Sequence, residues 1–168
     1  MEPTRPGLIT FLAATRNSLS VQWDPLLGED TGGTLANPIG ITAYELYMDN
    51  GFNGDFELVT SQIGTTYTIN YLTPGLLYRF RLRATNAIGY NSAFSTVQSM
   101  MCGTTPSSPG SPILVSQSSS LIHFYWTEPF DNGGTSITSY QIEIERTSDS
   151  NVHTFNVINS NEFEFDAS

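Results

Sequence analysis

Apolar and polar residues alternate along most of this chain, in short runs separated by glycine, proline, asparagine and aspartate. A period of two puts every second side chain on one face, which is the pattern of a half-buried β-strand. The pattern predicts seven strands in the N-terminal part, near residues 8–14, 18–23, 41–48, 56–60, 66–70, 77–86 and 94–101. Seven short strands and no helical period predict an all-β, antiparallel sandwich.

An internal repeat divides the chain. Four residues recur 103 positions further on: Pro3, Pro6, Gly7 and Trp23 return as Pro106, Pro109, Gly110 and Trp126. Beyond the tryptophan the offset falls to 96, because Tyr44 corresponds to Tyr140 and Tyr67 to Phe163. The first repeat therefore carries seven extra residues between its Trp and its Tyr, which we place in a surface loop. Proline and serine dominate residues 103–109, so we expect a semi-rigid linker there.

Several motifs resemble those of fibronectin type III domains. Trp23 ends the second predicted strand, and the turn at residues 72–75 leads into Tyr78 and the alternating Phe80, Leu82 and Ala84. The resemblance implies an immunoglobulin-like fibronectin type III sandwich of seven antiparallel strands for residues 4–105. It also implies an incomplete second domain for residues 106–168, in which Trp126 replaces Trp23 and the family's strands F and G are missing.

The resemblance further implies a tyrosine corner, in which the Tyr78 hydroxyl bonds to backbone between Leu72 and Gly75. We expect one buried core in the first repeat, made of Trp23, Tyr44, Leu46, Tyr67, Ile69, Leu72, Tyr78, Phe80 and Leu82. Half a sandwich buries too little apolar area to offset chain entropy. We therefore expect residues 106–168 to be disordered when isolated, or completed by a strand of another chain beside residues 138–145.

Charge narrows the range of partners. The net charge is −10, which argues against nucleic acid or an anionic membrane surface. Residues 106–168 hold eight acids and one arginine, and residues 1–105 hold eight acids and five arginines. High acidity and the lack of lysine favour a cell-surface or extracellular location for the protein. The lack of N-glycosylation sequons and of a second cysteine favours an intracellular, filament-associated one, so both stay open.

Residues with catalytic or metal-binding chemistry form no recognisable motif. His123, His153 and the lone Cys102 lie in no nucleophile–base arrangement, so we expect no enzyme activity, catalytic residue or cofactor. Residues 49–57 superficially resemble a calcium loop, but Gly51 and Thr60 stand where its third and twelfth positions need ligands, and we interpret the segment as a β-hairpin turn. The acidic residues Asp24, Glu29 and Asp30 are interpreted as a solvated loop, so no metal site is expected.

The strand predicted at residues 77–86 carries the candidate binding residues. Arg79, Arg81 and Arg83 alternate with inward-facing residues and should line its outer face. One interpretation is a cross-strand ladder with Glu45, Tyr47 and Asp49, which we expect to face outward from the neighbouring strand. The other is a docking stripe for an acidic partner, such as the acidic neighbouring repeat.

Two functions compete. The first is a non-enzymatic structural or adhesive module in a multi-repeat array, with other proteins and neighbouring repeats as partners. The second is a spacer or accessory domain of a larger enzyme or receptor.

Overall fold

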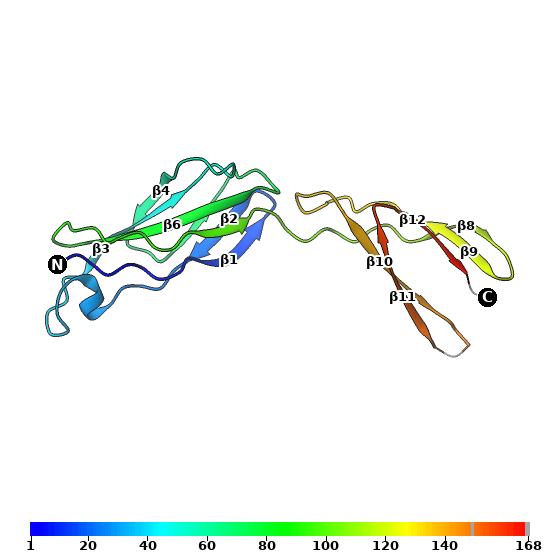
Figure 1. The fold of residues 1–168 in the computed structure, drawn as a ribbon, viewed down its shortest axis with the longest axis horizontal. Coiled ribbons are helices and arrows are strands. Elements are labelled where there is room, and N and C mark those ends of the chain that lie inside the picture. The colour runs from blue at the N-terminus through cyan, green and yellow to red at the C-terminus, as the bar shows by residue number, and fades with distance from the viewer. Residues whose placement is uncertain (149, 167–168) are drawn as a thin grey trace. The chain divides into compact units, whose positions relative to one another are not determined.

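The computed structural model describes residues 1–148 and 150–166, and the chain divides into two compact units, residues 1–104 and 105–168 (Figure 1). Each unit is built from short antiparallel strands, as the alternation predicted. A one-turn 3₁₀ helix, η1 (Gly28–Thr31), lies within the insertion of the first unit. No helix among the described residues is long and apolar enough to cross a bilayer.

The first unit is a sandwich of two sheets. The three-stranded sheet has the order β1-β2-β5, with bounds Thr10–Thr15, Ser18–Gln22 and Thr66–Ile69. The four-stranded sheet has the order β4-β3-β6-β7, with bounds Glu57–Gln62, Ile41–Met48, Leu77–Asn86 and Gln98–Met101. The predicted all-β sandwich is thus confirmed.

The strand predicted at residues 94–101 begins later, at Gln98. The reason lies in Ser92 and Ser95, whose hydroxyls accept the backbone N–H groups of Ala84 and Leu82 at 2.9 and 3.0 Å. Side-chain oxygens take the place of carbonyl partners along this part of β6, so regular pairing with β7 starts only at Phe80↔Gln98.

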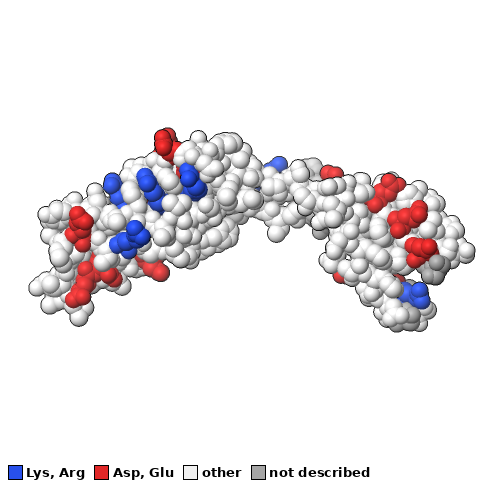
Figure 2. Space-filling view, in the orientation of Figure 1, with Lys and Arg blue, Asp and Glu red and all other residues white. Residues whose placement is uncertain are grey.

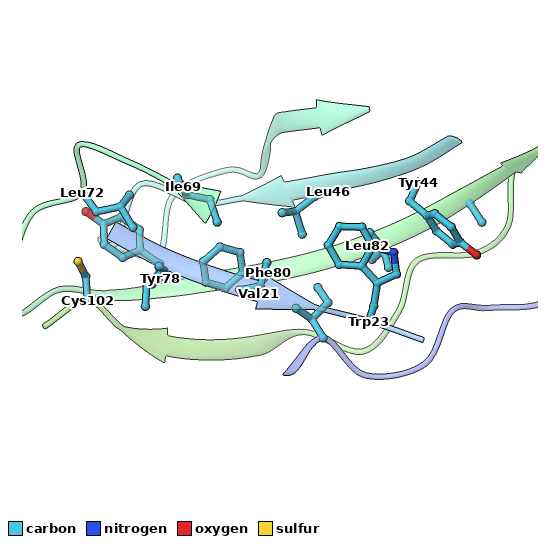
Figure 3. Close-up of a cluster of buried hydrophobic side chains, with 13 residues drawn as sticks. Val21, Trp23, Tyr44, Leu46, Ile69, Leu72, Tyr78, Phe80, Leu82 and Cys102 are labelled. Atoms are coloured by element: carbon cyan, nitrogen blue, oxygen red, sulfur yellow. The ribbon is translucent and has the colours of Figure 1, made fainter. Parts of the chain in front are cut away.

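The core lies between the two sheets, as the side chains in Figure 3 show. Eight of the nine predicted core residues are buried, and the centre is closed off from solvent: Leu46, Phe80 and Leu82 are 0% exposed. The ninth, Tyr67, is only partly buried, which corrects the prediction. It lies on β5, at the edge of the smaller sheet, where no further strand covers it.

The predicted tyrosine corner is present. The backbone N–H of Thr73 donates a hydrogen bond of 2.9 Å to the Tyr78 hydroxyl. Tyr78, the second residue of β6, is 5% exposed, so its hydroxyl ties the turn before β6 to the end of the core.

Replacing Tyr78 by phenylalanine should lower the free energy of unfolding by about 1–2 kcal/mol, because the Thr73 N–H loses its acceptor. Urea unfolding of the full chain measures this loss. Tyr71→Phe is the control, since Tyr71 is 95% exposed and should tolerate the change. Equal effects at the two positions would show that the Thr73–Tyr78 bond contributes nothing.

The described residues of the second unit form five strands. They are β8 (Ile113–Gln117), β9 (Leu121–Tyr125), β10 (Ser139–Glu145), β11 (Val152–Ile158) and β12 (Glu162–Asp166). Their sheets have the orders β12-β9-β8 and β10-β11, the same neighbours as β5-β2-β1 and β3-β4 in the first unit. Phe124, Trp126 and Val157 form a small core between them. Whether this unit keeps its fold without a partner stays a prediction.

Candidate functional site

The three arginines of β6 share its outer face. Burial alternates strictly along the strand, with Tyr78, Phe80, Leu82 and Ala84 buried and the arginines between them partly exposed. Strand β3 pairs with β6 in the register Glu45↔Arg83 and Tyr47↔Arg81. Basic groups gather on the first unit, whereas acidic groups prevail on the second (Figure 2).

Arg79 is held by a buried carboxylate. The Arg79 Nε donates to Asp49 Oδ2 at 2.8 Å, and the Arg79 backbone N–H donates to Asp49 Oδ1 at 2.8 Å. Asp49 was expected to face outward from the strand beside β6, and it contacts the outward-facing Arg79 as the ladder interpretation required, but its side chain is 0% exposed. Strand β3 ends at Met48, but the Asp49 backbone N–H still donates to the Arg79 carbonyl at 3.1 Å, and the Gly51 N–H of the following turn donates to Asp49 Oδ1 at 3.2 Å.

Two opposing influences act on the pKa of Asp49. Burial favours the neutral acid, but the hydrogen bonds from Arg79 and from the Gly51 N–H outweigh it and hold the pKa below its usual value. Both carboxylate oxygens are therefore occupied by donors of the protein. The bonds make Asp49 a structural anchor of the β6 end rather than a ligand for a cation.

The residues after Asp49 form the predicted hairpin turn. Asn50 Oδ1 accepts the backbone N–H groups of Phe52 and Gly54 at 3.0 and 3.2 Å. Gly51 and Asn53 take positive φ angles of 80° and 59°, which these residue types tolerate. The interpretation of this loop as a turn is confirmed.

Arg83 belongs to a closed polar triangle. Its Nε donates to Glu45 Oε2 at 2.7 Å, its Nη2 donates to the Tyr47 hydroxyl at 3.2 Å, and that hydroxyl donates to Glu45 Oε2 at 3.0 Å. The bond to Glu45 raises the pKa of Arg83. Burial first, and then the bond to Glu45, raises the pKa of Tyr47. The ladder contacts expected for Arg79 and Arg83 are thus both present.

Arg81 differs from its two neighbours. Its guanidinium lies 4.0 Å from the ring centre of Phe94, 4.4 Å from that of Phe56 and 5.6 Å from that of Tyr47. These are cation–π contacts, which partly replace the hydration of a cation. Among residues 1–148 and 150–166, no carboxylate forms an ion pair with Arg81, and its buried Nε has no hydrogen-bond partner. Within the described part of the chain, the partners of the Arg81 charge are aromatic rings.

Sequence reasoning missed Phe56 and Phe94. Phe56 immediately precedes β4, and Phe94 lies in the irregular segment between β6 and β7. Alternation fixes the side of a side chain only inside a regular strand. No periodic signal could therefore have placed these two rings over Arg81.

The other candidate residues have local structural roles. His123 Nε2 lies 2.6 Å from Glu162 Oε1 on the neighbouring strand, and the His153 ring packs near Phe155 and Phe165. Cys102 is 0% exposed, and its burial raises the pKa of the thiol. Among the described residues, no three His, Cys, Asp or Glu side chains are grouped as they would be around a metal ion.

Asp30, one of the three acids expected in a solvated loop, lies in η1 and is tied to the N-terminal segment. Its backbone carbonyl accepts the Thr4 N–H at 2.8 Å, and its Oδ1 accepts the Thr4 hydroxyl at 3.1 Å. The carboxylate therefore helps to fasten the insertion to the start of the chain.

Comparison with known proteins identifies relatives of this chain. The chain is 30% identical over 145 residues to fibronectin type-III domain-containing protein 3a of Gallus gallus, with 86% of this chain and 11% of that protein covered. It is 32% identical over 147 residues to chitinase A1 of Niallia circulans, with 83% of this chain and 19% of the chitinase covered. The chain thus spans only a small part of these relatives.

Among solved structures, the chicken CNTN1 FN1–FN3 domains match with a TM-score of 0.51 at 17% identity, over 99% of this chain and 58% of that one. This likeness bears on the fold. The fibronectin type III domain family matches residues 4–99, more than half of the chain. Together with the sandwich topology and the tyrosine corner, this match shows that the chain belongs to the fibronectin type III family.

Proposed function

We propose that residues 4–105 and 106–168 are tandem repeats, the second a partial one. Equivalent hydrogen bonds support this proposal. The Trp23 N–H donates to the Thr65 carbonyl at 3.0 Å, and the Trp126 N–H donates to the Asn161 carbonyl at 3.0 Å, at acceptor positions 96 residues apart. An alignment over 86% of the chain also cannot be contained in the first unit, so the likeness to the chicken protein reaches into the second.

We propose that the chain acts as a non-enzymatic structural or adhesive module that contacts other proteins through the outer face of β6. The observation that carries this proposal is Arg81, a cation bounded by three aromatic rings and without a carboxylate partner among the described residues. Arg79 and Arg83 already have such partners and serve to hold the face in shape. A guanidinium offers a planar set of donors that suits a carboxylate.

The partner that fits this face is an acidic segment, and neighbouring repeats supply that chemistry. The stretch of residues 106–168 has eight acids against one arginine. On β12, the acidic Glu162, Glu164 and Asp166 alternate with Phe163 and Phe165 and are exposed. A segment of this type could offer a carboxylate to Arg81 and aromatic edges to the rings around it.

An acidic peptide with the sequence of residues 159–168 tests the proposal on the full chain. Its binding should weaken steeply with salt, and Arg81→Gln should weaken it by about tenfold or more, because a charge-assisted hydrogen bond at a partly desolvated site contributes about 1.5–3 kcal/mol. Isothermal titration calorimetry measures the affinity of the parent and of each variant, and NMR shifts of the Arg81 side-chain N–H in the parent locate the contact.

Arg5→Gln is the matched control, since it removes the same charge from an exposed residue outside the sheets. Equal losses of affinity for Arg5→Gln and Arg81→Gln would mean that peptide binding depends only on the net charge of the chain. No shift at Arg81 at low salt would reject the β6 face as the contact surface.

The chitinase alignment favours a second candidate, an accessory domain that holds another domain of a larger enzyme or receptor. This chain matches about a fifth of that enzyme. A domain that only spaces other domains needs a stable sandwich and a connection at each of its termini. The sequence of the full transcript decides between the two. An adjoining catalytic domain would favour the accessory role, and further repeats without one would favour the structural role.

A further inference from the structure

Three asparagine–glycine pairs lie in turns of the chain, at residues 50–51, 53–54 and 132–133. Such pairs favour deamidation, because glycine has no side chain to hinder attack by its backbone nitrogen on the asparagine Cγ. The reaction has two requirements. The glycine N–H must be open to deprotonation, and the asparagine side chain must be free to rotate toward that nitrogen. The three pairs differ in both respects.

The first pair is held at both points. The Gly51 N–H donates at 3.2 Å to Oδ1 of the buried Asp49 carboxylate. A negative charge beside an N–H opposes the loss of its proton, because deprotonation would place a second negative charge there. Asn50 Oδ1 accepts the Phe52 and Gly54 N–H groups at 3.0 and 3.2 Å, so this side chain must break both bonds to rotate toward the glycine nitrogen. Deamidation of Asn50 is therefore opposed twice.

The pair in the second unit is held in the same way. The Gly133 N–H donates to Asp131 Oδ1 at 2.9 Å, and Asn132 Oδ1 accepts the Gly134 N–H at 3.1 Å. In both turns an aspartate immediately precedes the asparagine, and its carboxylate accepts the glycine N–H. The sequence Asp–Asn–Gly therefore combines a reactive pair with the group that protects it.

The pair at residues 53–54 is held by one weak bond. No acid precedes Asn53, and the Gly54 N–H donates at 3.2 Å to the neutral amide oxygen of Asn50, which it shares with the Phe52 N–H. Asn53 is exposed, and its side chain has no hydrogen-bond partner among residues 1–148 and 150–166. Neither the side chain nor a negative charge opposes the reaction here.

We propose that Asn53 is a site of spontaneous deamidation, and that Asn50 sets its rate by holding the Gly54 N–H. The Gly54 nitrogen gives up its proton and forms a bond to Asn53 Cγ. The bond from Cγ to the side-chain nitrogen breaks, and that nitrogen takes up the proton and leaves as ammonia. Water then opens the cyclic imide at either of its carbonyls. The product is aspartate or isoaspartate at position 53.

The modification would act on the anchor of Arg79. The Gly54 carbonyl accepts a hydrogen bond of 2.7 Å from Arg79 Nη2. Isoaspartate lengthens the main chain by a methylene group just before Gly54, which displaces this carbonyl from the guanidinium. Both products also add a carboxylate to the turn. This effect concerns Arg79 and is independent of the proposed role of Arg81.

The test incubates the full chain in mildly alkaline buffer and follows each pair by peptide mass spectrometry. Asn53 should convert fastest. Asn50→Ala should raise the rate at Asn53 by about two- to tenfold, the factor that corresponds to the loss of an ordinary hydrogen bond, and should leave the rate at Asn132 unchanged. In urea, where these bonds are absent, all three pairs should convert at similar rates.

Asn70→Ala is the matched control, because it removes an exposed asparagine side chain outside the turn and should leave the rate at Asn53 unchanged. Faster conversion at Asn50 or Asn132 than at Asn53 in the folded chain would overturn the proposal. So would an unchanged rate in Asn50→Ala, an equal increase in Asn70→Ala, or a lead of Asn53 that persists in urea.

A second measurement tests the link to Arg79. The isoaspartate product, separated by chromatography, should unfold at a lower urea concentration than Asn53→Asp. That variant carries the same added charge on an unchanged backbone, so the comparison isolates the displaced Gly54 carbonyl. Equal stability of the two chains would overturn the inferred effect on Arg79.

Discussion

Replacing Trp23 by alanine should destabilise the first unit by about 3–5 kcal/mol, the usual loss when a large aromatic side chain is removed from a core. Trp23 is 4% exposed, and its ring lies 5.9 Å from that of Tyr44. A domain of this size is stabilised by only about 5–15 kcal/mol, so the loss takes a large part of the total. Urea unfolding of the full chain, followed by hydrogen exchange in β2 and β6, measures it.

Trp23→Phe is the control, because it keeps an aromatic ring against Tyr44 and should cost clearly less than the alanine variant. Trp126→Ala should reduce protection in β8 to β12 and leave β2 and β6 unchanged. A stable first unit with alanine at position 23 would mean that this tryptophan is not central to the sandwich.

Most strands of the first unit could be predicted from alternation. Each strand is buried on one face only, so every second residue is apolar and the pattern indicates which side chains face the core. Strands β3 and β6 have the predicted bounds, Ile41–Met48 and Leu77–Asn86. The prediction was incomplete where β3 ends. Asp49 lies beside Arg79 as the alternation predicted, but alternation could not show that the following turn donates to its carboxylate or that this carboxylate is 0% exposed.

In the candidate site too, the parts on regular strands could be predicted from the sequence and the parts on irregular segments could not. The outer face of the arginines, and the pairing of Arg83 with Glu45, follow from strand register. The environment of Arg81 does not, because Phe56 and Phe94 come from irregular segments whose paths depend on the folded sheets. The distinction that makes Arg81 a candidate contact residue is therefore visible only in three dimensions.

Asp49→Ala should destabilise the first unit by about 3–5 kcal/mol, because it leaves the partly buried Arg79 guanidinium without its anionic partner. Three donors lose their acceptor at once: the Arg79 N–H, the Arg79 Nε and the Gly51 N–H. Arg79 Nη2 would keep its bond to the Gly54 carbonyl, which is 2.7 Å long, and that bond limits the loss. Asp55→Ala removes an exposed carboxylate from the same turn and should have little effect.

The stability of the first unit should also fall in acid through Asp49. Its folded pKa lies below the usual value of 3.8, so the ionised carboxylate stabilises the fold fully at pH values above about 4. This contribution is lost as the pH falls through the lower, folded pKa, where the acid becomes protonated in the native state too. Asp49→Asn cannot titrate, so its free energy of unfolding should be lower than that of the parent at pH 7, and the difference should shrink as the pH drops below 4. Urea unfolding from pH 7 to pH 2 measures both curves. A difference that stays constant over this range would mean that the charge of Asp49 contributes nothing, and that Asp49→Asn destabilises the fold only because an NH2 donor replaces one acceptor oxygen.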